Sequence, residues 1–225
     1  MRLAEFFVRH WAEILQSTGE HVWLVGVTML FAIAIGLPLG IVVTRRPWLA
    51  KPILGSANVA ETIPSLALFG FLLPIPWLGA RADRLAIVAL TLYALLPIIR
   101  NTAAGISGVD PAAREAARGM GMTNGQVLRK VELPLAMPTV IAGIRVATVL
   151  TIGIATIAAA VGAGGLGEFI FRGLAMVNDQ LIFAGAIPAA VLALLADFAL
   201  TLVEKRLRPG ARRERVNSYA APQSV

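Results

Sequence analysis

The side chains best suited to chemistry lie in a polar stretch at 115–138, which opens with Glu-Ala-Ala and contains a Leu-Pro pair. Glu115 and several basic residues supply charge there, and glycines supply turns. The chain has no nucleophile at a suitable spacing from a base, no metal-binding motif and no pair of carboxylates spaced for acid–base catalysis. It has no cysteine, which excludes disulfides, zinc–thiolate sites and cysteine nucleophiles. The sequence therefore predicts recognition of a partner at this stretch, with no catalytic residue and no metal.

The composition is that of an integral membrane protein. Hydrophobic residues make up 57% of the chain, charged residues 15%, and the mean hydropathy is +0.76. A soluble domain carries about 25% charged residues, so this chain falls outside that class. A stretch as charged as 115–138 does not lie in hydrocarbon, so it must face water between two membrane segments. The expected fold class is all-α and polytopic.

Five apolar stretches predict about five transmembrane helices, because roughly 20 apolar residues cross a hydrocarbon core. They lie at 21–43, 52–73, 85–99, 138–161 and 181–203. The segment at 1–19 has apolar residues at helical spacing among charges, which predicts an amphipathic helix lying in the membrane interface. We divide the chain into this N-terminal helix, a membrane domain at 20–204 with a polar loop at 100–136, and a basic tail at 205–225.

Two short helices are expected within the loop at 100–136. Asp110 followed by Pro111 is typical of a helix start, with an N-cap and a proline in the first turn. Glycines that include Gly121 predict a sharp turn after this helix. A second helix is expected over 123–131, ending at the Leu-Pro pair.

Two residues of the second span are candidates for a transport pathway or gate. Glu61 is an ionisable residue inside a membrane segment, where such groups commonly serve a pathway. A hydrogen-bonded carboxyl that holds two helices together is an equally good interpretation. Pro64 removes a backbone hydrogen bond and predicts a kink that faces protein rather than lipid.

The fourth span carries two further pathway candidates, Thr151 and Thr156. Like Gly143 and Gly153 in the same span, they are small, and such residues let membrane helices approach closely. Close helix packing and the lining of a pathway both remain open for these residues.

The basic residues are divided unequally between the two sides that five spans define. Fourteen fall on the side of the turn at 44–51, the loop at 100–136 and the tail, and five fall on the other side. Cytoplasmic segments carry the excess of Lys and Arg, so the loop and C-terminus are predicted in the cytoplasm and the N-terminus outside. The formal charge of +7 is explained by this topology and gives no support to nucleic-acid binding.

The glycine run at 162–167 formally matches G-x-G-x-x-G, but no predicted strand precedes it and it ends a membrane span. A flexible loop at the membrane surface explains it better than a dinucleotide site. No G-x-x-x-x-G-K-[ST] motif occurs, so the chain has no P-loop for ATP.

The polar stretch resembles the cytoplasmic EAA loop of ABC importer permeases, whose pattern is Glu-Ala-Ala, three residues, Gly, nine residues, an aliphatic residue, any residue, and Leu-Pro. The matching residues are Glu115, Ala116, Ala117, Gly121, Val131, Leu133 and Pro134. An exposed pair of alanines would let a partner approach closely, while Glu115 and the basic residues would orient it.

The resemblance implies a fold like that of type I ABC importer permeases, in the cell membrane. It implies that the loop docks on a cytoplasmic ATPase subunit, which binds ATP and Mg, and that this chain holds no cofactor. An external substrate-binding protein and a second permease subunit, expected to be a second copy of this chain, complete the assembly. Five spans are few to enclose a pathway, which independently favours a dimer.

Further stretches are similar to permeases for glycine betaine, carnitine and choline, which implies an osmoprotectant substrate. They lie at 36–41, 62–68, 96–102, 131–136 and 155–159. One alternative is a permease for methionine or another amino acid. The other is an ion-coupled secondary transporter with Glu61 as its coupling carboxylate, against which stand the EAA-like loop and the lack of a detectable inverted repeat.

Overall fold

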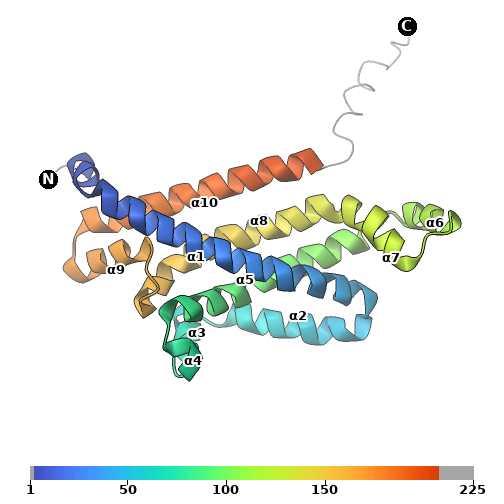
Figure 1. The fold of residues 1–225 in the computed structure, drawn as a ribbon, viewed down its shortest axis with the longest axis horizontal. Helices are drawn as coiled ribbons and strands as arrows, with labels where there is room; N and C mark the ends of the chain where they lie inside the picture. The colour runs from blue at the N-terminus through green and yellow to red at the C-terminus, as the bar shows by residue number, and fades with distance from the viewer. Residues whose placement is uncertain (1–2, 208–225) are drawn as a thin grey trace, which may run out of the picture.

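The computed structural model describes residues 3–207, and this part of the chain folds into helices without any strand (Figure 1). Within it, four helices, counted with the short turns that extend them, are long and apolar enough to cross a membrane. They are built around α1 (Leu3–Arg45), α5 (Ala82–Ser107), α8 (Leu133–Ala158) and α10 (Asp179–Leu207). The predicted all-α, multi-pass fold is confirmed. The predicted tail lies outside the described residues from residue 208 onward.

The first helix joins the segment predicted at 1–19 to the first predicted span. Its departure from helical geometry is at His10, where φ is −109° and ψ is 15°. Phe6, before this kink, is buried in a cluster with Phe169 of α9 (Gly167–Met176). The helix continues through residue 19, and its kink lies earlier, at His10. The location of this segment in the membrane interface stays a prediction.

The second predicted span is not one helix. The chain forms α2 (Pro47–Thr62), α3 (Ser65–Leu72) and the single turn α4 (Pro76–Gly79). Ile63 is extended, with φ −69° and ψ 130°, because a residue before proline avoids the helical region. Tyr93 of α5 donates its hydroxyl hydrogen to the Ile63 carbonyl oxygen, which the break leaves without a helical partner. The kink predicted at Pro64 is present as a complete break, so 52–73 is not one helix.

The elements divide between two ends of the bundle. In Figure 1 the turn from α1 to α2, the loop between α5 and α8, and the last turn of α10 lie toward the right. The start of α1, the short helices α3 and α4, and α9 lie toward the left. We call the right-hand group, which consists of residues 44–51, 107–133 and 204–207, the basic end. These residues overlap the turn at 44–51, the loop at 100–136 and the start of the tail, which the sequence assigns to one side of the membrane.

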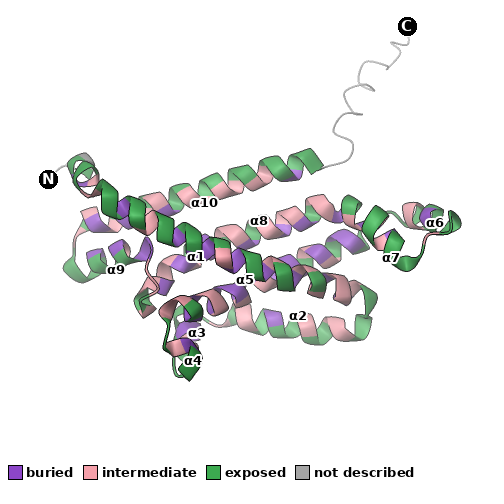
Figure 2. Ribbon diagram, in the orientation of Figure 1, coloured by how far each residue is buried: buried purple, intermediate pink, exposed green. Residues whose placement is uncertain are grey.

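α5 lies at the centre of the bundle and packs on α1, α2 and α8. Its buried residues extend from Leu85 at one end to Ile106 at the other. The largest apolar cluster gathers around α5 from α1, α3 and α8. By contrast, α10 packs on α8 and α9 and leaves most of its large apolar side chains exposed (Figure 2). Such a surface suits contact with lipid or with another membrane helix.

A polar network ties α10 to α8. Arg145 Nη1 donates to Thr201 Oγ1 at 2.8 Å and lies 3.6 Å from Asp197 Oδ1. Its Nη2 lies 3.7 Å from Glu204 Oε2. An arginine within a membrane helix is costly unless it is paired, so this network compensates the charge and fixes α10 beside α8.

Helix α8 approaches α5 closely at Gly143. A β-carbon at this position would overlap Asn101 and lie 2.9 Å from the carbonyl oxygen of Pro97, both on α5. Close packing, one of the two interpretations of this span, is therefore confirmed at Gly143. At Gly153 no other described part of this chain comes close, because a β-carbon there would meet nothing within 4 Å.

Replacing Gly143 with alanine should destabilise the protein by about 1–3 kcal/mol, since the added methyl group overpacks the α5–α8 contact. Tryptophan fluorescence of the detergent-solubilised protein should show a melting temperature lower by several degrees. Gly153→Ala is the matched control on the same helix. Its melting temperature should be unchanged or higher, because alanine favours helix by up to about 1 kcal/mol. Equal losses in the two variants would contradict the close approach.

Candidate functional site

The loop between α5 and α8 begins with helix α6 (Pro111–Gly119). Asp110 caps this helix, because its Oδ1 accepts a hydrogen bond of 2.9 Å from the Ala112 amide. Pro111 occupies the first turn, where an amide hydrogen has no helical partner and its absence costs nothing. The predicted helix start is confirmed.

A Schellman turn ends α6 and depends on Gly121, whose φ of 79° is left-handed. The Gly121 amide donates to the Arg118 carbonyl at 2.9 Å, and the Met122 amide donates to the Ala117 carbonyl at 3.2 Å. A β-carbon on Gly121 would meet nothing within 4 Å, so the backbone conformation and not the space requires glycine. The predicted sharp turn is confirmed.

Thr123 starts the second short helix, α7 (Asn124–Val127), through a capping box with Gln126. The Thr123 amide donates to Gln126 Oε1 at 2.8 Å, and the Gln126 amide donates to Thr123 Oγ1 at 3.4 Å. α7 then continues through a π-helical turn (Leu128–Glu132) directly into α8. The predicted end at the Leu-Pro pair is wrong, because Pro134 lies in the first turn of α8, where proline is tolerated.

The residues of the Glu-Ala-Ala motif divide between two faces of α6. Glu115 and Ala116 are exposed, whereas Ala117 is buried with 1% of its surface accessible. The predicted exposed pair of alanines is therefore wrong for Ala117, which faces the rest of the protein. α6 offers Glu115 and the small Ala116 to solvent, and a partner surface can approach its backbone closely there. At the other end of the motif, Val131 and Leu133 are half-buried and Pro134 is exposed.

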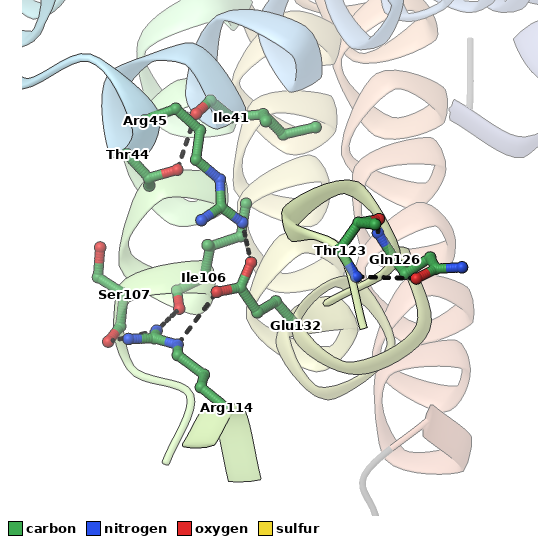
Figure 3. Close-up of polar contacts among 9 residues, drawn as sticks. All are labelled: Ile41, Thr44, Arg45, Ile106, Ser107, Arg114, Thr123, Gln126 and Glu132. Carbon is green, nitrogen blue, oxygen red and sulfur yellow. Dashed lines mark hydrogen bonds and ion pairs between the residues drawn. The ribbon is translucent and has the colours of Figure 1, made fainter. Parts of the chain in front are cut away.

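A buried carboxylate anchors this loop to the bundle (Figure 3). Glu132, at the end of the π turn, is 2% exposed and forms an ion pair with Arg45 at the end of α1. Its Oε1 also lies 3.1 Å from Nε of Arg114 on α6. Arg114 in turn donates to the Ile106 carbonyl and, at 3.2 Å, to the Ser107 carbonyl at the end of α5. We call Glu132, Arg45 and Arg114 the Glu132 clamp.

The electrostatics of the Glu132 clamp explain its geometry. A carboxylate with little water around it needs opposite charge and hydrogen-bond donors. Arg45 supplies both, whereas Arg114 supplies positive charge at 3.1 Å without a hydrogen bond to Glu132. Arg114 also neutralises the partial negative charge at the C-terminus of α5. The side chains of Arg45 and Arg114 keep 37% and 24% of their surfaces accessible, so water reaches them and lowers the desolvation cost. The clamp joins α1, α5, α6 and α8 at the basic end.

Sequence reasoning missed Glu132, because it occupies the position of the EAA-like pattern at which any residue is allowed. Arg45 entered only as part of a count of basic residues. The available signal was a carboxylate between the apolar Val131 and Leu133, since a charge in such a setting is usually paired. Its partners lie 87 and 18 positions away, so only the tertiary structure could identify them.

The pathway candidates of the second span lie at the break between α2 and α3. Glu61 is half-buried in the last turn of α2, and Pro64 is exposed at the start of α3. Tyr93 holds the intervening Ile63, as described above. Membrane proteins tolerate such a helix break where protein or water satisfies the backbone groups that it frees, as Tyr93 does here. The pathway role of Glu61 and Pro64 stays a prediction.

The two threonines of α8 make different contacts. Thr151 is 1% exposed, and its hydroxyl faces the sulfur of Met29 on α1 at 3.8 Å. Thr156 is half-buried, and its hydroxyl donates to the Gly153 carbonyl within α8 at 2.8 Å. Thr151 therefore takes part in packing between α1 and α8 in this chain.

The glycine run at 162–167 turns the chain from α8 to α9 at the end opposite the loop. Gly162, Gly164 and Gly165 all have φ near +80°. The Gly165 amide donates to Oε2 of Glu20 on α1 at 3.1 Å, so the turn is packed against the bundle. Within residues 3–207, no group of three or more His, Asp or Glu side chains gathers to hold a metal ion.

Comparison with known proteins gives a consistent result. A family model for binding-protein-dependent transport system inner membrane components matches residues 15–209. The carnitine transport permease protein OpuCB of Listeria monocytogenes is 43% identical over 212 residues, which cover 94% of this chain and 96% of that protein. The glycine betaine/carnitine/choline transport system permease protein OpuCB of Bacillus subtilis is 39% identical over 208 residues, covering 92% and 94%.

A solved structure of the MetNI methionine ABC transporter in inward-facing conformations resembles this fold. The TM-score is 0.77 at 25% identity, and the match covers 86% of this chain and 95% of that chain. The fold expected from the sequence is thereby confirmed.

Gly121→Ala should loosen the turn after α6, because a left-handed backbone costs a residue with a β-carbon about 1–2 kcal/mol. Hydrogen exchange should accelerate at the Gly121 and Met122 positions by about 5- to 30-fold, the equivalent of that cost. Gly125→Ala is the matched control, since its φ is not left-handed and nothing lies near the new methyl group. Unchanged exchange in Gly121→Ala would show that the turn does not depend on glycine.

Proposed function

The chain belongs to the family of binding-protein-dependent transport system inner membrane components, and we propose on that basis that it is the permease subunit of an ATP-driven osmoprotectant importer. The proposed substrates are glycine betaine, carnitine and choline. One observation carries this assignment: identities of 43% and 39% over nearly the whole chain to permeases named for these compounds. The likeness to the methionine transporter is at 25% identity, which makes an amino acid the second candidate.

The basic end is the cytoplasmic end in this proposal, because Lys and Arg collect on the cytoplasmic side of membrane proteins. The C-terminus then lies in the cytoplasm and the N-terminus outside. The EAA-like loop docks on the ATPase subunit through the exposed face of α6, with Glu115 for orientation and Ala116 for close approach. ATP and Mg bind to that separate chain, and this one holds neither.

The opposite end receives an external substrate-binding protein. A second copy of the chain completes the pathway, and the exposed apolar surface of α10 and its neighbours leaves room for it. Glu61, Pro64, Thr151 and Thr156 remain the proposed pathway or gate residues. Alternating access follows when closure of the ATPase dimer moves the loop and, with it, the membrane helices.

Uptake into lipid vesicles tests the function directly. The chain, its ATPase and its binding protein are reconstituted, and labelled glycine betaine, carnitine, choline and methionine are supplied one at a time. Uptake of a quaternary ammonium compound that requires internal ATP supports the proposal. Uptake of methionine alone selects the second candidate, and uptake that follows an ion gradient without ATP rejects the importer assignment.

Ala116→Arg should abolish copurification of the ATPase, because a long charged side chain blocks close approach to α6. Ala80→Arg is the matched control, since Ala80 is also an exposed alanine but lies beside α4 at the opposite end. The control should retain the ATPase as the unmodified chain does. Equal retention by both variants would show that the ATPase docks elsewhere.

A further inference from the structure

We propose that Glu132 is a positioning residue that makes α6 move as one body with the ends of α1, α5 and α8. The inference rests on the proposed function, since it concerns how motion of a docked ATPase reaches the membrane helices. Glu132 touches neither the ATPase face of α6 nor the pathway candidates. It acts through its two arginine partners.

The chain connectivity shows why a clamp is needed. The loop is joined covalently to α5 through the short link before Asp110, and to α8 through the π turn. No short chain segment links the loop directly to α1, whose last residue, Arg45, lies 87 positions before Glu132. Apolar contacts of Leu37 and Ile41 with a cluster that includes Val140 bring α1 alongside. The ion pair between Arg45 and Glu132 fixes the end of α1 to the loop.

The burial of Glu132 makes this connection stiff. If α1 moved away from α6, the ion pair between Arg45 and Glu132 would break. The desolvated carboxylate would then be paired with Arg114 alone. Breaking one side of a buried ion pair is far more costly than breaking an exposed one, because water cannot replace the lost charge. The motion that costs the least free energy is therefore one in which Glu132 keeps its contacts with both Arg45 and Arg114.

Arg114 extends the connection to α5 and orients the docking face. Its guanidinium group contacts Glu132 and the carbonyl groups of Ile106 and Ser107, so one planar cation on α6 joins the end of α5 to the start of α8. Arg114 directly precedes Glu115, and the two side chains leave α6 on different faces, one toward the bundle and one toward solvent. A force on the solvent face of α6 is thus passed through Arg114 to Glu132.

The test measures substrate molecules transported per ATP hydrolysed in the reconstituted importer. Glu132→Gln keeps the shape of the side chain and removes its charge, so the two arginines repel. The number of substrate molecules transported per ATP should fall by about 2- to 30-fold, while ATP hydrolysis continues. This is the range expected when a residue that couples two sites is replaced. Asp83→Asn, which breaks an exposed ion pair with Arg81 at the opposite end, should leave the ratio unchanged. An unchanged ratio in Glu132→Gln overturns the proposal.

A milder pair of variants covers the case in which Glu132→Gln does not fold. Arg45 is partly exposed, so its replacement disturbs the fold less. Arg45→Gln removes the ion pair with Glu132 and leaves Glu132 paired with Arg114. Its ratio should fall, whereas Arg45→Lys, which keeps the positive charge, should restore most of the ratio. A purely local structural role would lower the stability of these variants without lowering transport per ATP.

A second readout is independent of the transport assignment. The chain has no cysteine, so Ala34→Cys on α1 and Ala112→Cys on α6, both exposed, can carry two spin labels. Electron–electron distance measurements in lipid discs should give one narrow distribution, which Glu132→Gln broadens. Distance distributions of equal width with and without Glu132→Gln overturn the proposed role of the clamp, even if transport is ATP-driven. A narrow distribution with no ATP-driven uptake rejects the proposed function and leaves the clamp standing.

Discussion

A buried negative charge is the constraint on which the basic end of this protein depends. Glu132 lies where water scarcely reaches it, so the chain must bring positive charge to it from elsewhere. One arginine comes from the end of α1 and the other from α6. The need to compensate one carboxylate therefore fixes the mutual positions of helices that are distant in sequence. The short, polar α6 would otherwise project from the bundle with few apolar contacts of its own.

Local hydrogen bonds also fix the geometry of the loop. An N-cap at Asp110, a left-handed glycine at Gly121 and a capping box at Thr123 specify where each short helix begins and ends. Isolated helices of this length are marginal in water, so these terminal hydrogen bonds and the Glu132 clamp supply stability that short helices lack. The result is a loop with defined hydrogen bonds that exposes Glu115 and Ala116 to solvent.

The rest of the bundle follows a different physical rule. Around α5, glycine and apolar side chains allow close helix contact, as at Gly143, and this packing gives a firm centre. α10 and the break at Pro64 are less enclosed, and α10 is tied to α8 by the Arg145 network. The bundle is therefore most tightly packed at α5 and more exposed at α10.

The sequence by itself determined the membrane class, the position of the polar loop, the cap at Asp110 and the turn at Gly121, because these depend on composition and on residues close together in the chain. It also located the EAA-like motif, whose spacing is local. It predicted a kink at Pro64, though not a complete break, because proline acts locally on the residue before it. It missed the passage of the helix through Pro134 and the burial of Ala117, because the π turn and packing decide these. Above all it missed the Glu132 clamp. Pairing across 87 positions follows from which helix ends meet in space, and only the tertiary structure decides that.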